Sequence, residues 1–176
     1  MLKVGDKNFE PYIDKSQIQK AVLKVALAIE NDLGDETPLF IGVLNGSFMF
    51  CADFMKVFNA ACEISFVKLA SYEKSASTGK VTSLLGLNEN LKGRTVVVLE
   101  DIIDTGNTLE KIYEILEKED IKTLKIATLF FKPTVFDKKL KIDYIGMEIP
   151  DEFILGYGLD YDGLGRNLSD IYKLSN

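Results

Sequence analysis

The 176-residue sequence contains no histidine and only two cysteines. Without histidine, catalytic triads and metal sites built on imidazole are excluded, and carboxylates become the expected acid–base groups. The cysteines, Cys51 and Cys62, stand in apolar surroundings. We therefore expect buried, reduced thiols rather than a disulfide, which is the pattern of a cytoplasmic protein.

The sequence also lacks long apolar runs and dense clusters of basic residues. No stretch approaches the ~20 apolar residues of a membrane-spanning helix, and residues 1–12 lack the apolar core of a signal peptide. A net charge of −6 without a Lys/Arg-rich run argues against broad nucleic-acid binding. The length predicts one domain over residues 1–176, and 47% hydrophobic with 27% charged residues is typical of a globular chain.

The most informative stretch is residues 95–109, TVVVLEDIIDTGNTL. It opens with a short, β-branched apolar run at 96–99, typical of a strand buried on both faces. A small-residue turn at 105–108 follows, and then a helical pattern that predicts a helix to about Glu119. A turn that leads into a helix N-terminus presents free N–H groups and the positive dipole end, so it can bind a phosphate.

The turn residues suit that role. Gly106 allows a close approach or a positive φ, and the hydroxyls of Thr105 and Thr108 can donate to a phosphate or cap the helix. The turn has no Lys, which excludes a GxxxxGK[ST] phosphate loop. The alternative interpretation is an ordinary capped helix after a core strand.

Two carboxylates, Glu100 and Asp101, separate the strand from the turn, and a third follows at Asp104. Two acids at the end of a buried strand are costly unless they have a role. They would repel a bare phosphate, but sugar hydroxyls and a hard divalent cation both suit carboxylate oxygens. We therefore expect a ligand with a sugar diol, a phosphate and bound Mg²⁺.

The stretch VVVLEDIIDTGNTL resembles the phosphoribosyl-pyrophosphate (PRPP) motif of the type I phosphoribosyltransferases, and its EDIIDTG core is most similar to the hypoxanthine-guanine branch. The resemblance implies Mg²⁺-dependent transfer of ribose 5-phosphate from PRPP to N9 of a 6-oxopurine, with release of pyrophosphate. It also implies that Glu100 and Asp101 hold the ribose hydroxyls and the metal, and that Asp104 accepts the N7 proton. The implied 5-phosphate site is Thr105, Gly106, Asn107 and Thr108.

A second strand–turn–helix is predicted at residues 38–58, with its turn at 45–47. The resemblance implies that Leu44, Asn45 and Gly46 bind pyrophosphate, with a cis peptide between the first two. Many relatives have Lys or Arg where this chain has Asn45. That difference places more weight on Mg²⁺ and on backbone N–H groups.

Residues 62–69 predict a strand, and the polar stretch 70–82 predicts a flexible hairpin loop. The resemblance implies that this loop is a lid, in which Ser71 and Tyr72 match the family's mobile loop. Such a lid would exclude water from the reacting sugar.

The strand predicted at 123–131 ends at Lys132, on the edge of an α/β sheet where ligands bind. A solvated lysine is the alternative, but the resemblance implies that Lys132 donates to the purine 6-oxo group. Residues 142–170 resemble the family's purine-binding hood. Phe153 would stack on the base, although a core role is the alternative, and the Ile154 backbone would address the purine edge.

Two further charges in this segment are implied to act on PRPP. Asp160 would hold Mg²⁺ through water, and Arg166 would face pyrophosphate.

A helix at 14–34 and the alternation of strands and helices predict an α/β fold. We expect a mainly parallel sheet with helices on both faces, a lid loop and a small C-terminal hood. Two alternatives stay open: a phosphoribosyltransferase for another base, such as xanthine or a pyrimidine, and a PRPP-binding regulator on the same fold. The expected partners are PRPP and the base, without nucleic acid or membrane, in a homodimer or homotetramer as in relatives.

Overall fold

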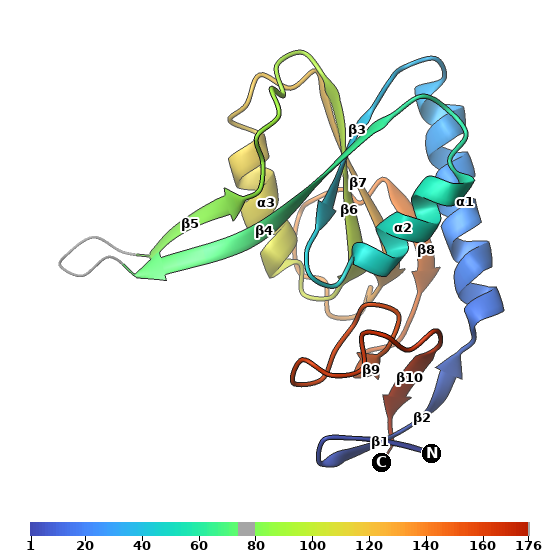
Figure 1. Ribbon diagram of the computed structural model, residues 1–176. Coiled ribbons are helices and arrows are strands. Elements are labelled where there is room, and N and C mark those ends of the chain that lie inside the picture. The colour runs from blue at the N-terminus through green and yellow to red at the C-terminus, as the bar shows by residue number, and fades with distance from the viewer. Residues whose placement is uncertain (74–79, 176) are drawn as a thin grey trace.

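The structure is a computed structural model that describes residues 1–73 and 80–175 (Figure 1). In this part of the chain, the strands form a six-stranded sheet and a four-stranded sheet. The elements in chain order are β1 (Leu2–Val4), β2 (Lys7–Ile13), α1 (Lys15–Leu33), β3 (Leu39–Val43), α2 (Phe48–Val57), β4 (Glu63–Glu73), β5 (Lys80–Leu85), β6 (Thr95–Ile103), α3 (Asn107–Leu116), β7 (Thr123–Phe131), β8 (Tyr144–Glu148), β9 (Ile154–Leu155) and β10 (Ile171–Leu174).

The central sheet has the strand order β5-β4-β3-β6-β7-β8. All neighbours from β4 to β8 pair in parallel, and only β5 is antiparallel, to β4. β6 lies between β3 and β7, and its run at 96–99 is completely buried. The prediction of a mainly parallel sheet with a doubly buried central strand is therefore confirmed.

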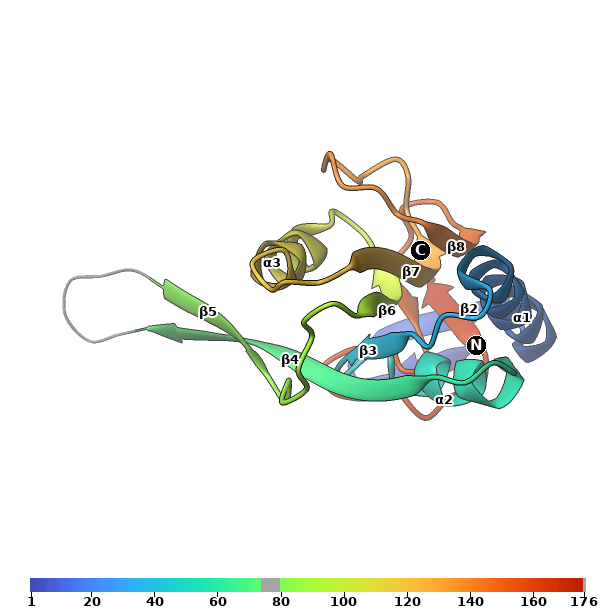
Figure 2. The same cartoon turned by 90° about the horizontal axis from the view of Figure 1, so that it is seen from above.

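Helices cover both faces of this sheet, as predicted: α1 and α2 lie on one face and α3 on the other (Figure 2). Alternate residues of β6 point to opposite faces, because successive side chains of a strand alternate. Val97 and Leu99 pack in the core beside α1 and α2, whereas Val96 and Val98 pack in the core beside α3.

α1 begins and ends where the sequence indicates. Asp14 accepts the N–H groups of Ser16 and Gln17, and the Gln17 side chain accepts the N–H of Asp14 in return, which forms a capping box. Gly34 ends the helix with φ +57°, a conformation that disfavours a Cβ.

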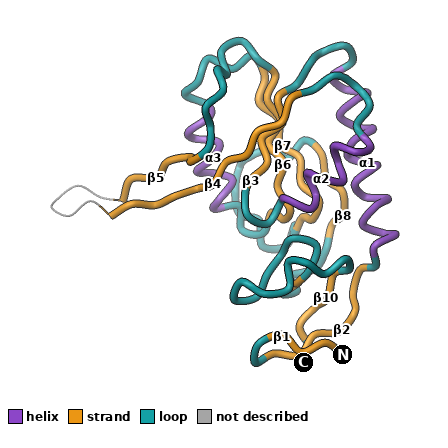
Figure 3. Tube along the Cα trace, viewed as in Figure 1, coloured by secondary structure: helices purple, strands orange, loops and turns teal. Residues whose placement is uncertain are grey.

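The second sheet has the order β1-β2-β10-β9 and lies next to the carboxyl ends of the central strands, close to both termini of the chain (Figure 1). Loops occupy the region between the two sheets (Figure 3). The sequence analysis missed β1, β2 and β10. It also grouped β8 with the hood, although β8 pairs with β7 in the central sheet.

Three predicted boundaries were wrong. β6 continues to Ile103, because β7 pairs with it beyond the carboxylates, so the acids lie within the strand. α3 ends at Leu116 rather than near Glu119, because the N–H groups of residues 118 and 119 bond to carbonyls three residues back. β4 extends to Glu73 because β5 pairs with it antiparallel up to that residue.

Consequently the backbone of Ser71 and Tyr72 lies in a β-ladder rather than in a loop. Residues 80–82 of the predicted lid belong to β5, and its residues 74–79 lie outside the described residues.

The cysteines are both free, as expected, although only Cys51 is fully buried and Cys62 is partly exposed. Among the residues that the structure describes, no helix is long and apolar enough to span a membrane.

Phe54 provides a test of the core beneath α2. Its fully buried ring lies 4.8 Å from Phe40 and 5.4 Å from Phe58, measured between ring centroids. Phe54→Ala should lower the free energy of unfolding by about 3–5 kcal/mol, because it leaves a cavity in the core. The matched control is Leu85→Ala, at the end of β5, whose side chain is 44% exposed. Urea unfolding that finds equal losses in both variants would contradict this account of the core.

Candidate functional site

The carboxylates of β6 are withdrawn from water at the edge of the sheet where its parallel strands end. Glu100 is 5% exposed and Asp101 is 8% exposed. Burial raises the pKa of Asp101 to about 6. Burial and the neighbouring Asp101 charge raise the pKa of Glu100 well above its usual value. Two such groups are poised to accept hydrogen bonds from hydroxyls or to meet a cation.

The loop between β3 and α2 lies directly against Asp101. A Cβ added at Gly46 would stand 1.8 Å from Asp101 Oδ2, so only glycine fits there. On the other side, a Cβ at Gly158 would stand 2.0 Å from the Gly46 carbonyl oxygen. The peptide bond between Leu44 and Asn45 is cis, as the resemblance implied. The loop is thus held between a buried carboxylate and the segment that follows β9.

The turn before α3 forms a small anion-sized recess. A cavity of about 210 Å³ is lined by Glu100 and residues 102–109. Gly106 has φ +83°, and a Cβ there would stand 2.6 Å from the Phe136 ring, so conformation and space both require glycine. Within the described residues, no side chain caps α3. The first amides of the helix are therefore available to an anion, and the alternative of an ordinary side-chain-capped helix is not supported.

Lys132 stands at the end of β7 and is only 5% exposed. Its Nζ lies 3.2 Å from Asp104 Oδ2 and 3.1 Å from Asp151 Oδ1. An ammonium group has three N–H donors, and these two carboxylates account for two of them among the described residues. Because Lys132 is buried and held by two carboxylates, it is not the solvated lysine of the alternative interpretation.

Arg166 and Asp160 form an ion pair at the same cavity. The two side chains approach to 2.5 Å, and Arg166 also donates to the Gly158 carbonyl oxygen at 2.7 Å. The other oxygen of Asp160 accepts the N–H of Gly163 at 2.7 Å. The pair therefore presents a positive and a negative group in fixed positions.

Phe153 is half-exposed, at 44%, rather than a core residue. Its carbonyl accepts the N–H of Leu174 in β10, at 3.0 Å, and Ile154 follows it into β9. An exposed aromatic ring held by a strand is suited to stacking on a flat ligand.

Most of the predicted site residues therefore meet. A cavity of about 330 Å³ is lined by Gly46, Asp101, Ile102, Asp104, Lys132, Phe153, Ile154, Leu159, Asp160 and Arg166. Asp104 lines this cavity and also the recess before α3, so the two are contiguous.

Two predicted residues do not line these cavities, and two others cannot be placed relative to them. Leu44 and Asn45 precede the lining residue Gly46 but do not line either cavity themselves. The side chains of Ser71 and Tyr72 lie outside what the structure describes. The sequence analysis missed Asp151; the signal was an acid directly after Pro150, two residues before the aromatic Phe153.

The donor set fits Mg²⁺ that arrives with a ligand. Within residues 1–73 and 80–175, no group of three His, Cys, Asp or Glu side chains is arranged for a metal. Glu100, Asp101 and Asp160 nevertheless offer oxygen ligands beside the cavity. Mg²⁺ is usually bound by one or two carboxylates together with substrate phosphates and waters, so a complete protein cage is not required.

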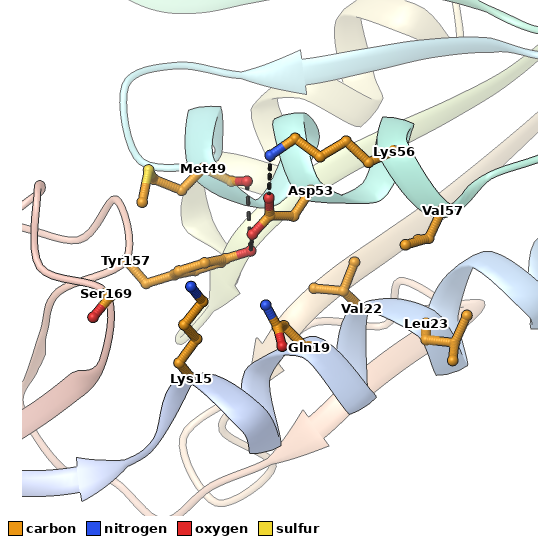
Figure 4. Close-up of a pocket in the computed structure, with 10 residues that line it drawn as sticks. All are labelled: Lys15, Gln19, Val22, Leu23, Met49, Asp53, Lys56, Val57, Tyr157 and Ser169. Carbon is orange, nitrogen blue, oxygen red and sulfur yellow. Dashed lines mark hydrogen bonds and ion pairs between the residues drawn. The ribbon is translucent and has the colours of Figure 1, made fainter.

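A larger cavity of about 550 Å³ lies between α1, α2 and Tyr157 (Figure 4). The Tyr157 hydroxyl donates to Asp53 Oδ2 at 2.8 Å, and Lys56 pairs with the same carboxylate. None of the predicted site residues lines this cavity. The candidate site is therefore the cavity at the carboxyl edge of the sheet.

Comparison with known proteins points to the same chemistry. Residues 12–162 match the family model described as "Phosphoribosyl transferase domain". The chain is 38% identical over 157 residues to the hypoxanthine-guanine phosphoribosyltransferase of Bacillus subtilis, which covers 89% of this chain and 87% of that protein. It is 37% identical over 169 residues to the hypoxanthine phosphoribosyltransferase of Escherichia coli, which covers 94% of each.

Solved structures agree with this fold. A hypoxanthine-guanine phosphoribosyltransferase from Bacillus anthracis, crystallised with a HEPES molecule in its active site, has a TM-score of 0.86 at 36% identity and covers 97% of this chain and 99% of that one. A hypoxanthine phosphoribosyltransferase from Trypanosoma cruzi has a TM-score of 0.82 at 30% identity, covering 94% and 95%.

Burial of the ionised Asp101 carboxylate should lower the free energy of unfolding. The pKa of Asp101 is raised to about 6 in the fold from 3.8, so the folded protein binds its proton more tightly than the unfolded chain does. The free energy of unfolding should therefore fall as pH rises between these values. Asp101→Asn should make the protein more stable than the parent by about 1–3 kcal/mol at pH 8, and the difference should vanish near pH 4.

The measurement is urea unfolding in a metal chelator across this pH range. The charged side chains near the Asp101 carboxylate are Glu100, Asp160 and Arg166. Arg166 is the cation among them, so Arg166→Gln provides a control that removes the charge favourable to the ionised carboxylate. An Asn variant less stable than the parent at pH 8 would show that the ionised carboxylate stabilises the fold.

Proposed function

The chain belongs to the phosphoribosyl transferase domain family and is a phosphoribosyltransferase, and from this premise we propose the reaction, the substrates and the residues that act on them. The enzyme serves purine salvage. It transfers ribose 5-phosphate from PRPP to N9 of hypoxanthine, and also of guanine, giving IMP or GMP and pyrophosphate. The names of its relatives support this choice of base. The observation that carries the proposal is the Lys132–Asp104 pair beside Phe153, in a cavity contiguous with the recess before α3.

The 5-phosphate binds in the recess before α3. Amides at the start of the helix donate to the phosphate oxygens, together with the hydroxyls of Thr105 and Thr108. Gly106 and Asn107 complete this turn. Glu100 and Asp101 accept hydrogen bonds from the ribose hydroxyls, which are donors that compensate two buried carboxylates.

Pyrophosphate lies between the cis-peptide loop and Arg166. Leu44, Asn45 and Gly46 contribute backbone groups, and the guanidinium contributes charge. When bound, Mg²⁺ supplies positive charge that screens the phosphates and stabilises the leaving pyrophosphate. Asp160 holds it through water, beside the β6 carboxylates.

The base lies between Phe153 and Lys132. The free N–H of Lys132 donates to the 6-oxo group, the ring of Phe153 stacks on the purine, and the Ile154 backbone meets its edge. The Lys132 donor matches hypoxanthine, guanine and xanthine, all of which carry this oxygen, and opposes the 6-amino group of adenine.

Asp104 is the general base. The bond from C1 of the ribose to the pyrophosphate oxygen breaks, and the oxygen leaves with the electron pair. The N9 lone pair of the base forms the new bond to C1. The proton on N7 passes to Asp104, which is exposed enough to reach a ligand and is held by Lys132.

The stretch 70–82, in which Ser71 and Tyr72 match the family's mobile loop, acts as the lid and excludes water during transfer. The enzyme works in the cytoplasm, which its free thiols support. It assembles as a homodimer or homotetramer; exposed apolar residues such as Leu23, Leu27 and Phe48 on α1 and α2 are available for contact.

Among the alternatives, xanthine stays open as a base because it shares the 6-oxo group. Pyrimidines are disfavoured because Lys132 and Phe153, which the resemblance assigns to a purine, both line the cavity. A regulatory role on this fold has no observation in its favour, because the relatives are named as enzymes.

Incubation with PRPP, Mg²⁺ and a panel of bases tests the function directly. We expect nucleotide from hypoxanthine and guanine, negligible nucleotide from adenine, and none from any base in EDTA until Mg²⁺ is restored. Chromatography of the products with pyrophosphate release provides the measurement. Full activity in chelator would refute the roles of the three carboxylates, and preferred use of adenine would refute the base site.

Lys132→Met separates base selection from PRPP binding. The variant keeps most of the side-chain length but removes the donor, so kcat/KM for hypoxanthine should fall by an amount equivalent to about 1.5–3 kcal/mol. The KM for PRPP should change little. Lys92→Met, at an exposed surface lysine, is the control. Unchanged hypoxanthine kinetics in Lys132→Met would place the 6-oxo contact elsewhere.

A further inference from the structure

The Phe153 ring is held by residues of the N-terminal hairpin as well as by its own segment. Its centroid lies 6.3 Å from that of Phe9, which is fully buried, and 5.9 Å from that of Tyr161 in perpendicular contact. The ammonium of Lys7 stands over the same group, 5.6 Å from the Phe153 centroid and 4.6 Å from the Tyr161 centroid. These four side chains form one cluster, which we call the aromatic support.

Of the aromatic support, Phe153 alone lines the candidate site cavity. Phe153 lines the 330 Å³ cavity, whereas Lys7, Phe9 and Tyr161 do not. Lys7 instead borders a separate cavity with Asn8 and the end of β10. The ring therefore borders the cavity and is also contacted by Lys7, Phe9 and Tyr161, which do not.

The backbone ties the same parts together. Phe9 pairs with Leu174 in β10, and the N–H of Leu174 donates to the Phe153 carbonyl oxygen at 3.0 Å. The hairpin of β1 and β2 is therefore connected to the stacking residue through a single intervening strand.

The ammonium of Lys7 contacts the Phe153 and Tyr161 rings and forms no ion pair with the residues that the structure describes. In the described part of the chain, no carboxylate lies within ion-pair distance of its Nζ. The carboxylate next to it in sequence, Asp6, accepts instead the hydroxyl of Tyr161 at 2.7 Å. Lys7 thus stands over the electron-rich faces of two rings, one of which Asp6 anchors, and its charge also attracts the Asp6 carboxylate.

The aromatic support falls partly outside the stretch that matches the family model, which begins at residue 12. We propose that Lys7 is a positioning residue for the 6-oxopurine: it acts through Phe153 and Tyr161 to hold the stacking ring in one orientation before the base arrives. This inference rests on the proposed function, since it names how the base site of that reaction is preorganised.

The physical reason is the exposure of Phe153. A half-exposed ring must be ordered when a base stacks on it, and that ordering weakens binding. A cation over the rings, together with the edge contact of Tyr161, orders the ring in advance. Removal of the cation should therefore weaken binding of the base and leave PRPP binding and kcat unchanged.

The experiment compares Lys7→Met, Lys7→Arg and the control Lys3→Met in the full chain. Met keeps the stem of the side chain, Arg keeps a cation that also packs on rings, and Lys3→Met removes one positive charge from the same hairpin. We expect Lys7→Met to raise the KM for hypoxanthine about two- to fivefold, the size of an exposed cation–π contact. The KM for PRPP, kcat and the thermal midpoint should match those of Lys3→Met, and Lys7→Arg should restore the parent value.

Three results would overturn the proposal: a hypoxanthine KM equal to that of Lys3→Met, an equal rise in both KM values, or an Arg variant no better than Met. A second readout does not depend on turnover. In selectively labelled free protein, the aromatic NMR signals of Phe153 should shift toward averaged values in Lys7→Met but not in Lys3→Met. A parent that forms no nucleotide would refute the proposed function, and unchanged Phe153 signals would refute the positioning role independently.

Discussion

The contact between Gly46 and the carboxylate of Asp101 is the constraint on which the site depends. The central strand β6 carries an acid into a position where burial raises its pKa to about 6, and the β3–α2 loop lies against it so closely that no side chain fits. Gly158 closes on the far side of the same loop. The central sheet, the β3–α2 loop and the segment after β9 therefore meet around one buried carboxylate, whose burial is costly until a ligand compensates it.

Charge is balanced differently on the base side of the cavity. Lys132 is nearly buried between Asp104 and Asp151, so two carboxylates compensate its positive charge. In the proposed reaction, this arrangement leaves one N–H donor for a neutral 6-oxo group and orients Asp104 to accept a proton. In the proposed aromatic support, the ammonium of Lys7 likewise stands over two aromatic rings. In both proposals the lysine acts through a fixed position more than through long-range attraction.

Local signals explain why so much of the sheet could be predicted. The apolar run at 96–99, the caps Asp14 and Gly34, and the glycine of the turn before α3 each require a particular local structure, and each is observed. The wrong strand boundaries lie where hydrogen bonding to a neighbouring strand sets the end of the element. β6 runs on through its acids because β7 pairs alongside, and the β4–β5 ladder converts a polar stretch into strand. The residues of β6 and β4 do not themselves indicate which strand will pair with them.

The sequence by itself determined the buried apolar run of β6, the two acids that follow it and the helix start behind them, because these follow from the order of residues along one segment. Only the tertiary structure decided that Asp151 shares Lys132 with Asp104 and that a hairpin from the N-terminus supports Phe153. It also decided that Gly46 touches Asp101, across 55 positions of the chain. The physical reason is that these are contacts between distant segments, and their distances are set by how two sheets pack rather than by any local preference of the residues that meet.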